Sequence, residues 1–228
     1  MELKQIAHIE SPYATKFGVP RQAGLAGGRA RVVFEPEYRV AEAVRGLEGY
    51  DYVWLLWEFH LNGRQAWRPT VRPPRLGGNR RVGVFATRSP YRPNAVGLSS
   101  VRLLGVAVDA QLGPVLEVEG ADLVDGTPIF DIKPYIAYAD SHPEARSGFA
   151  QEAPREALAL DDAQGLLDTL PEALAASLRQ SLAQDPRPHY QDDPLRSYGM
   201  LFGGYEVKFH VVDKTLIIDS LDKTEGKI

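Results

Sequence analysis

Cysteine is absent from the 228-residue chain, and this absence excludes disulfides, thiolate nucleophiles and zinc–thiolate sites together. The five histidines form neither an H-E-x-x-H nor an H-x-x-E-H arrangement, so we expect no metal site. No run approaches the roughly 18 apolar residues of a membrane span. The N-terminal residues also lack the basic and then apolar layout of a signal peptide. We therefore expect a cytoplasmic protein with no membrane partner.

Acidic residues are missing from a long stretch in the first half of the chain. Between Glu58 and Asp109 there is no acid and no lysine, whereas nine arginines lie there, in a chain whose net charge is −4. Such segregation of charge indicates an anionic partner for one face of the molecule, and arginine suits bidentate contacts with phosphate or carboxylate groups. The alternative is a solvated loop whose charges pair with acids elsewhere.

Short strands separated by glycine and proline dominate the first 140 residues, which is typical of a barrel or a sandwich. The Tyr52–Phe59 segment is too continuously apolar for an edge strand and should be central. One helix is expected where Val40, Val44 and Leu47 share a face, with Gly49 as its stop. The predicted strands are Leu3–Ile9, Arg31–Phe34, Tyr52–Phe59, Arg81–Ala86, Leu98–Val108, Val115–Val118 and Ile129–Ile132.

The composition changes around Ser141–Pro154, where the residues are small, polar and include proline. We interpret this change as the junction between two domains. The sequence therefore predicts a mainly β domain over residues 1–140 and a small α+β domain over residues 141–228.

The second domain is expected to contain one helix and two strands. Thr169 and Glu172 fit a capping box at the start of the helix. Strands are predicted at Glu206–Val212, where apolar residues alternate, and at Thr215–Ile218 after a turn. The apolar stripe of the helix recurs every four residues at Leu170, Leu174, Leu178 and Leu182.

Two glycine-rich stretches could suggest a nucleotide-binding loop. A strand-like segment at Arg31–Phe34 follows Gly24–Gly28, and Gly77-Gly78 does not open a helix. A Rossmann or P-loop site needs a helix N-terminus to receive the phosphates. We therefore interpret both stretches as turns and predict no Rossmann fold.

The segment Gly83–Ser99 is a stronger candidate for a ligand site than the two glycine-rich stretches. A strand runs into a turn held by Pro90 and Pro93, and these prolines lower the entropy cost of holding side chains toward a ligand. A purely structural proline-rich turn is the alternative. The charge, ring and amide groups that a nucleotide needs are present on Arg88, Ser89, Tyr91, Arg92 and Asn94.

This segment resembles the signature of the TsaA-like family, the tRNA adenine-37 N6-methyltransferases. Asn94-Ala95-Val96 stands where members often have Asn-Pro-Ile, and both versions are small and then branched apolar. The Asp185–Tyr190 run resembles a motif of the longer, bacterial members. The pieces that agree in order and spacing within residues 1–140 are Pro20-Arg21-Gln22, Phe59-His60-Leu61, Asp125-Gly126-Thr127-Pro128, Asp131–Tyr135 and Tyr138–Asp140.

The resemblance implies an enzyme that uses S-adenosylmethionine (SAM) on a small antiparallel β-barrel and works as a homodimer, with the cofactor near the subunit interface. The implied partner is the anticodon stem-loop of a tRNA that carries N6-threonylcarbamoyladenosine, and the product gains an N6-methyl group. By motif, the implied cofactor contacts are Pro20, Arg21, Gln22, His60, Leu61, Arg88, Leu98, Asp125, Gly126, Thr127 and Pro128.

Methyl transfer from a sulfonium is an in-line displacement, so alignment and exclusion of water can supply much of the acceleration. Arg88 or Arg21 is suited to hold the methionine carboxylate of the cofactor. His60 and the turn at Asp125–Pro128 could hold its adenosine or amino group. The carbamoyl group withdraws electrons from the acceptor nitrogen, so a strong general base is not required. The candidates for an assisting base are His60, Asp125 and Tyr135.

The other arginines of the acid-free window, with Trp67, are expected to contact the tRNA backbone, and such binding weakens steeply with salt. Tyr91, Arg92 and Asn94 could face the cofactor, the tRNA or the dimer interface. For Asp185–Tyr190, a helix stop followed by a loop is the alternative. The predicted tRNA contacts are Arg64, Arg68, Arg72, Arg75, Arg80, Arg81, Arg92, Arg187 and Tyr190.

Three rival functions remain open at this point. The first is a binding barrel that holds a nucleotide-like ligand as a sensor, without transfer. The second is a methyltransferase that acts on another small molecule or on a protein, for which the basic window would not be needed. The third is a structural interaction protein, which leaves the rigid Arg-Pro loop unexplained.

Overall fold

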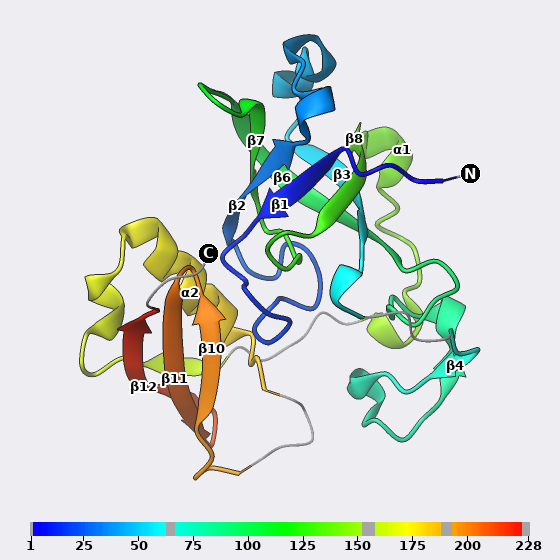
Figure 1. The fold of residues 1–228 in the computed structure, drawn as a ribbon. Coiled ribbons are helices and arrows are strands. Elements are labelled where there is room, and N and C mark those ends of the chain that lie inside the picture. The colour runs from blue at the N-terminus through cyan, green and yellow to red at the C-terminus, as the bar shows by residue number, and fades with distance from the viewer. Residues whose placement is uncertain (1, 63–66, 152–157, 188–192, 225–228) are drawn as a thin grey trace.

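The computed structural model describes residues 2–62, 67–151, 158–187 and 193–224, and it contains two β units that lie side by side (Figure 1). Each unit has its own apolar core. The mainly β class predicted from the sequence is confirmed. Within the described ranges, no helix is long and apolar enough to cross a membrane.

The larger unit is a closed barrel with the strand order β1-β2-β7-β6-β3-β8, in which all neighbours are antiparallel. The seam between the first and last of these strands is short, because only Ala7 with Ile129 and His8 with Pro128 are paired there. The barrel strands are β1 (Ala7–Glu10), β2 (Arg29–Phe34), β3 (Tyr52–Glu58), β6 (Val96–Asp109), β7 (Gly113–Glu119) and β8 (Pro128–Pro134).

Strand β3 is central, as its apolar sequence predicts, because β6 pairs along one side of it and β8 along the other. Val53, Leu55 and Trp57 alternate along it and point into the barrel core, where all three are buried. Alternation with a period of two places their neighbours, such as Trp54, on the outside. At the end of β3 that carries Trp57, the rim of the barrel is therefore lined by side chains from the inner and the outer face of the strand.

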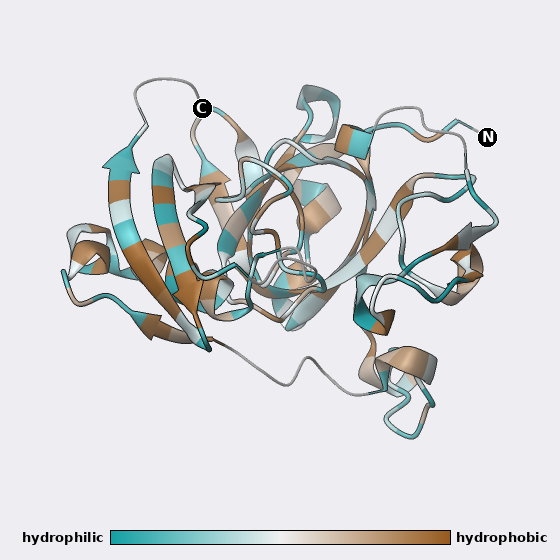
Figure 2. Cartoon of the chain, turned by 90° about the horizontal axis from the view of Figure 1, so that it is seen from below, coloured by the Kyte–Doolittle hydropathy of each residue, from teal (hydrophilic) through white to brown (hydrophobic). Residues whose placement is uncertain are grey.

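The smaller unit is a four-stranded sheet in the order β10-β11-β12-β9, with an α-helix, α2 (Glu172–Ala183), packed on it. Figure 2 shows hydrophobic and hydrophilic residues alternating along this sheet. Leu178 and Leu182 are fully buried, so the predicted leucine stripe faces the sheet. The strands are β9 (Ala159–Asp161), β10 (Tyr198–Phe202), β11 (Tyr205–Val212) and β12 (Thr215–Lys223).

A small lobe projects from the barrel between β3 and β6, and its two short strands are antiparallel (Figure 1). They are β4 (Thr70–Val71) and β5 (Val82–Gly83). The other short elements are α1 (Ala137–Asp140) and the 3₁₀ helices η1 (Pro36–Tyr38), η2 (Ala41–Val44), η3 (Leu47–Gly49), η4 (His60–Asn62), η5 (Pro74–Leu76), η6 (Val84–Ala86), η7 (Gly148–Ala150) and η8 (Leu166–Thr169).

Three local predictions in the barrel unit are wrong. The expected helix at Val40–Gly49 is two 3₁₀ turns, because Gly46 between them has φ 89° and cannot continue a right-handed helix. The predicted strand at Arg81–Ala86 is limited to β5 and then turns into η6. The first strand begins at Ala7 rather than Leu3, since the residues before it have no full partner strand.

The predicted capping box of α2 is also wrong. Pro171 is the N-cap, so the helix starts later, and the Thr169 hydroxyl donates instead to the Leu166 carbonyl at 2.7 Å. Strands β9 and β10 were not predicted. The Gly199 that interrupts β10 and the three-residue length of β9 leave little periodic signal.

The segment at residues 11–28 connects the barrel strands β1 and β2, but it packs into the core of the smaller unit. The buried Tyr13 ring meets Phe202 edge to face, and its hydroxyl forms a 2.9 Å hydrogen bond with the Ser181 hydroxyl of α2. Phe17 stacks on Phe209, and the Gln180 side chain accepts a hydrogen bond from the Gly27 backbone. The smaller unit therefore holds this segment in place.

Candidate active site

A cavity of about 470 Å³ opens at the rim of the barrel. Its walls come from the end of β3, the start of β6, the segment at residues 11–28, the loop between η6 and β6, and the connection that precedes β8. Ligand pockets for molecules of cofactor size have volumes of roughly 300–1,000 Å³. The cavity therefore has room for a nucleoside-sized ligand.

Most of the predicted cofactor contacts meet in this cavity although they are far apart in the sequence. Tyr135 and Asp125 do not line it, and neither do Gly126 and Pro128. The predicted residues that do line it are Pro20, Arg21, Gln22, His60, Leu61, Arg88, Leu98 and Thr127.

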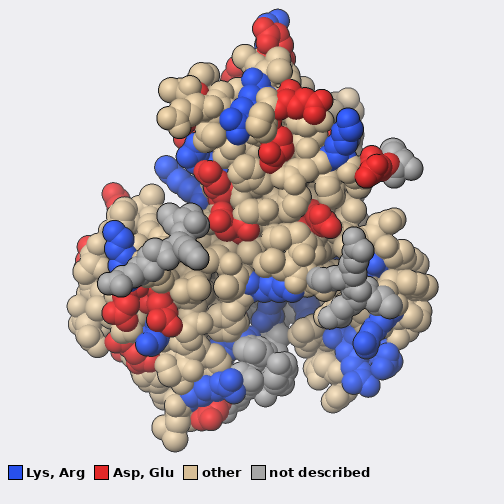
Figure 3. All heavy atoms as spheres, in the orientation of Figure 1, with Lys and Arg blue, Asp and Glu red and all other residues tan. Residues whose placement is uncertain are grey.

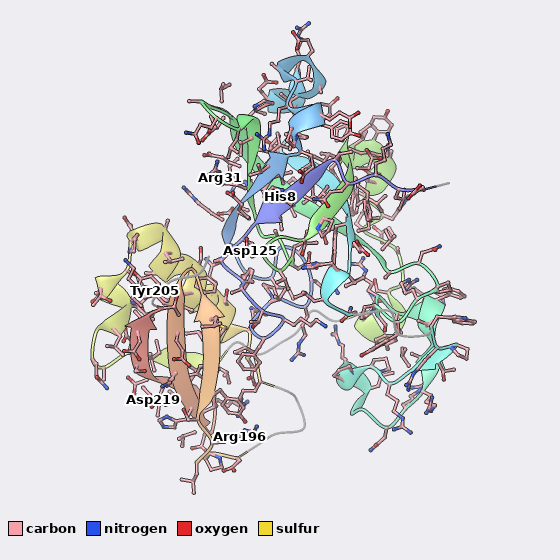
Figure 4. The ribbon with its side chains drawn as sticks, in the orientation of Figure 1. His8, Arg31, Asp125, Arg196, Tyr205 and Asp219 are labelled. Carbon is pink, nitrogen blue, oxygen red and sulfur yellow. The ribbon has the colours of Figure 1, made fainter. Side chains whose placement is uncertain are left out.

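The Asp125 carboxylate has a structural contact, since its Oδ1 accepts a 2.8 Å hydrogen bond from the Ser11 backbone N–H. Figure 4 shows Asp125 at the end of the barrel that faces the smaller unit. Tyr135 lies against Tyr52 and Trp54, at centroid distances of 6.1 and 5.9 Å. Of the three candidate bases, His60 is thus the one that lines the cavity.

The Pro20-Arg21-Gln22 run is fixed from two sides. Upstream of it, the Lys16 ammonium donates to the Leu61 carbonyl at 2.7 Å and to the Asn62 side chain at 2.6 Å. At its other end, the Arg88 guanidinium donates to the Gln22 side-chain oxygen. Desolvation lowers the pKa of the Arg21 guanidinium, and the nearby Asp185 carboxylate acts in the opposite direction.

The loop that carries Arg88 is braced by its own polar groups. The Thr87 hydroxyl donates to the Val84 carbonyl at 2.8 Å, and the Arg92 guanidinium donates to the Thr87 carbonyl at 2.6 Å. Arg92 also lies over the Phe85 ring at 5.8 Å. Arg92 therefore supports the loop from within, while Arg88 is exposed and faces the cavity.

Sequence reasoning missed a buried polar chain at the cavity floor. The Trp57 indole N–H donates to the Ser99 hydroxyl at 3.0 Å, and that hydroxyl donates to the Asp122 carboxylate at 2.6 Å. Burial raises the pKa of Asp122, although the Ser99 hydrogen bond and the charge of Arg88 act in the opposite direction. A usable signal existed, because this acid stands alone in the apolar run Ala121–Val124.

Basic side chains gather on the lobe that borders the cavity, and Figure 3 shows them as a compact patch. Among the described residues, none of them is in an ion pair with a carboxylate, whereas Arg102 of the same window pairs with Glu119 at 3.3 Å on the barrel. Trp67 and Phe85 expose 50% and 73% of their surface on the lobe. The predicted tRNA contacts found here are Arg68, Arg72, Arg75, Arg80 and Arg81.

The predicted contacts in the smaller unit are placed differently. Arg187 is 8% exposed and makes two 2.9 Å hydrogen bonds to the Asp185 carboxylate. This packing suits support of the loop after α2 better than a grip on phosphate. Tyr190 and, in the barrel unit, Arg64 lie outside the described residues.

Comparison with known proteins identifies the family. The model of the tRNA-methyltransferase O N-terminal domain matches residues 8–141, and that of the TrmO C-terminal domain matches residues 155–224. The chain belongs to the tRNA-methyltransferase O family. The family membership predicted from the motifs is thereby confirmed.

Three relatives of this chain match it along 94% or more of their own length. The tRNA (adenine(37)-N6)-methyltransferase of Escherichia coli K12 is 42% identical over 232 residues, which cover 97% of each chain. The crystal structure of TrmO from Pseudomonas aeruginosa has a TM-score of 0.77 and 32% identity over 97% of each chain. A Methanothermobacter thermautotrophicus relative named for S-adenosyl-L-methionine binding is 36% identical over 62% of this chain and 94% of its own.

Proposed function

We propose that this protein adds a methyl group to N6 of N6-threonylcarbamoyladenosine at position 37 of tRNA, beside the anticodon. Relatives of this chain are named tRNA (adenine(37)-N6)-methyltransferase and S-adenosylmethionine-dependent methyltransferase. The names of these relatives do not mention a threonylcarbamoyl group, so its presence on the substrate is our proposal. The observation that carries the proposal is the cavity at the barrel rim, where the motif residues meet beside a basic lobe whose described arginines form no ion pair with a carboxylate.

The chemistry of the cavity fits SAM. When bound, SAM supplies an electrophilic methyl group on a sulfonium. Arg88 is exposed toward the cavity and held by Gln22, so its guanidinium is placed to bind the carboxylate of the methionine part. Trp57 and Phe59, with ring centroids 4.3 Å apart, supply an apolar wall for the remainder of the cofactor.

We propose His60 as the group that assists removal of the N6 proton. It lines the cavity, whereas Asp125 and Tyr135 do not. Because the carbamoyl group already withdraws electrons from the acceptor nitrogen, the assistance required is small. The walls of the cavity contribute mainly by aligning the donor and acceptor and by excluding water.

The anticodon stem-loop would lie across the basic lobe, with the target base directed to the barrel rim. The five arginines of the lobe offer phosphate contacts, and the exposed Trp67 and Phe85 rings can stack on unpaired bases. Within this proposal, residues 1–140 form the SAM-binding methyltransferase domain. Residues 141–228 contribute to tRNA binding and hold the cofactor segment through Tyr13.

We further propose a cytoplasmic homodimer with the cofactor near the interface. Tyr52, Trp54 and Tyr135 form a cluster of contacting rings on the outside of the barrel, where Tyr52 exposes 44% of its surface. Three residues further along the chain, Tyr138 exposes 91%. Trp54 also lines the cavity, which links this cluster to the site. Light scattering of Tyr138→Ser is expected to show a shift toward monomer relative to the wild type.

The proposal is tested by incubating the protein with labelled SAM and with tRNA that carries, or lacks, the threonylcarbamoyl group. Nucleoside mass spectrometry should find the added methyl on the threonylcarbamoyl nucleoside alone. Equal methylation of both tRNAs would refute the substrate assignment and leave the family activity intact. Methylation of neither, with SAM bound, would favour the sensor function instead.

A further inference from the structure

The cavity presents an unequal set of charges to any ligand. Its cationic side chains are Lys16, Arg21 and Arg88, together with Arg92. Among the described residues that line it, the carboxylates are Glu58 and Asp122. SAM carries two positive groups, an ammonium and the sulfonium, against one carboxylate. A cationic ligand centre buried among these guanidinium groups needs a nearby anion, since an unpaired buried charge is strongly unfavourable.

Asp122 is the carboxylate that the fold holds in a fixed position. Ser99 donates to its Oδ1 at 2.6 Å, and Ser99 is itself buried and held by the Trp57 indole. Glu58, at the end of β3, has no such fixing hydrogen bond within the described residues. A preorganised charge stabilises a ligand without a reorganisation cost when the ligand binds.

We propose that the Asp122 carboxylate is the counter-charge for the sulfonium of SAM and thereby lets the site prefer SAM over S-adenosylhomocysteine. The proposal rests on the placement of SAM in the barrel-rim cavity. Methyl transfer converts the charged sulfonium into a neutral thioether. The attraction to Asp122 is lost at that moment, so the product is released more readily than the substrate.

This role differs from that of a general base. An anion beside the sulfonium stabilises the bound cofactor before transfer, whereas a base acts on the acceptor nitrogen during transfer. Removal of the charge should therefore raise the Kd for SAM but should not slow a single turnover at saturating SAM. A base would show the opposite pattern.

The experiment is calorimetric titration of the full chain with three ligands. SAM carries the sulfonium, sinefungin carries an ammonium group at the corresponding position, and S-adenosylhomocysteine is neutral there. For Asp122→Asn we expect at least about a tenfold loss of affinity for SAM and sinefungin, as measured for close charge pairs. The affinity for S-adenosylhomocysteine should change by no more than about twofold.

Two control variants separate the charge from local structure. Ser99→Ala removes the hydrogen bond to Asp122 but keeps its charge, so the preference for SAM over S-adenosylhomocysteine should persist. Asp131→Asn removes a carboxylate that pairs with Lys133 on β8 outside the cavity, and should change none of the three affinities. If Asp122→Asn does not fold, Asp122→Ser provides a second neutral side chain for the same titrations.

Equal weakening of all three ligands by Asp122→Asn, or no weakening at all, would overturn the proposal. Arg88→Ala separates this failure from failure of the cavity assignment itself. Arg88→Ala could weaken the binding of all three ligands while Asp122→Asn does not selectively weaken the binding of SAM and sinefungin. In that case the cavity binds the cofactor but Asp122 is not the counter-charge. If neither variant changes any affinity, SAM binds elsewhere and both proposals fail.

Discussion

Replacement of Gly97 by alanine tests whether the floor of the cavity is as tightly built as its geometry indicates. A Cβ at this position would lie 2.3 Å from Cε2 and 2.4 Å from Cζ2 of the Trp57 indole. No real methyl group tolerates such distances, so the ring must move. Trp57 is 7% exposed, packs on Phe59 and donates to Ser99, so its movement disrupts both contacts.

The expected cost of Gly97→Ala has two parts. Overpacking of a filled core costs about 1–3 kcal/mol. Loss of the Trp57–Ser99 hydrogen bond adds about 1 kcal/mol. The sum, about 2–4 kcal/mol, corresponds to a fall in Tm of roughly 4–16 °C for a protein of this size. The affinity for SAM should also fall, because Trp57 and Ser99 line the cavity.

Gly105→Ala is the matched control for this measurement. Gly105 lies on the same strand, β6, and a Cβ there meets no atom within 4 Å. Alanine at this position should leave Tm unchanged or raise it slightly, because it reduces the entropy of the unfolded chain. A Gly97→Ala protein with the Tm and the SAM affinity of the Gly105→Ala control would refute the reasoning about the cavity floor.

Three further predictions follow from the site. Arg88→Ala should abolish SAM binding in calorimetry while Tm stays within about 2 °C of the wild type, because an exposed side chain contributes little to folding; unchanged affinity would contradict the assignment. Arg72→Ala and Arg75→Ala on the lobe should each weaken tRNA binding and lower the slope of log K against log salt by about one, and a binding curve insensitive to salt would contradict a phosphate contact. Burial raises the pKa of Asp122, so the folded protein loses stability as pH rises past the ordinary aspartate pKa. Asp122→Asn should therefore have a higher Tm than the wild type at pH 7, and this difference in Tm should vanish in acid. A difference in Tm that grows as the pH falls would contradict a raised pKa of Asp122.

Much of the barrel could be predicted because its signals are local and periodic. Strand β3 is apolar on both faces and is paired on both sides, as its sequence indicates. The wrongly predicted helix at Val40–Gly49 shows where such local signals fail. Its apolar spacing is helical, and only the left-handed φ of Gly46 breaks it into two 3₁₀ turns.

The candidate site was predicted to the extent that its residues lie in recognisable motifs. Arg88, His60 and Gln22 carry the family pattern, and all three line one cavity. Asp122 carries no motif of its own, and its importance arises from burial beside Ser99, which joins residues 23 positions apart. Such a contact arises from the tertiary fold and cannot be read from sequence spacing.

The smaller unit shows a second limit of sequence reasoning. Tyr13 precedes the cofactor motif by a few residues and gives no sign that its side chain completes a distant core. The structure places it against Ser181 and Phe202, in the unit formed by the last third of the chain. A packing partner so remote in sequence emerges only from the tertiary fold.

The most direct test of the proposed activity is mass spectrometry of nucleosides from tRNA incubated with the protein and SAM. We predict a mass increase of one methyl group on N6-threonylcarbamoyladenosine at position 37, no increase on tRNA that lacks the threonylcarbamoyl group, and no increase with Arg88→Ala. Methylation at any other nucleoside, or unchanged methylation by Arg88→Ala, would contradict the account.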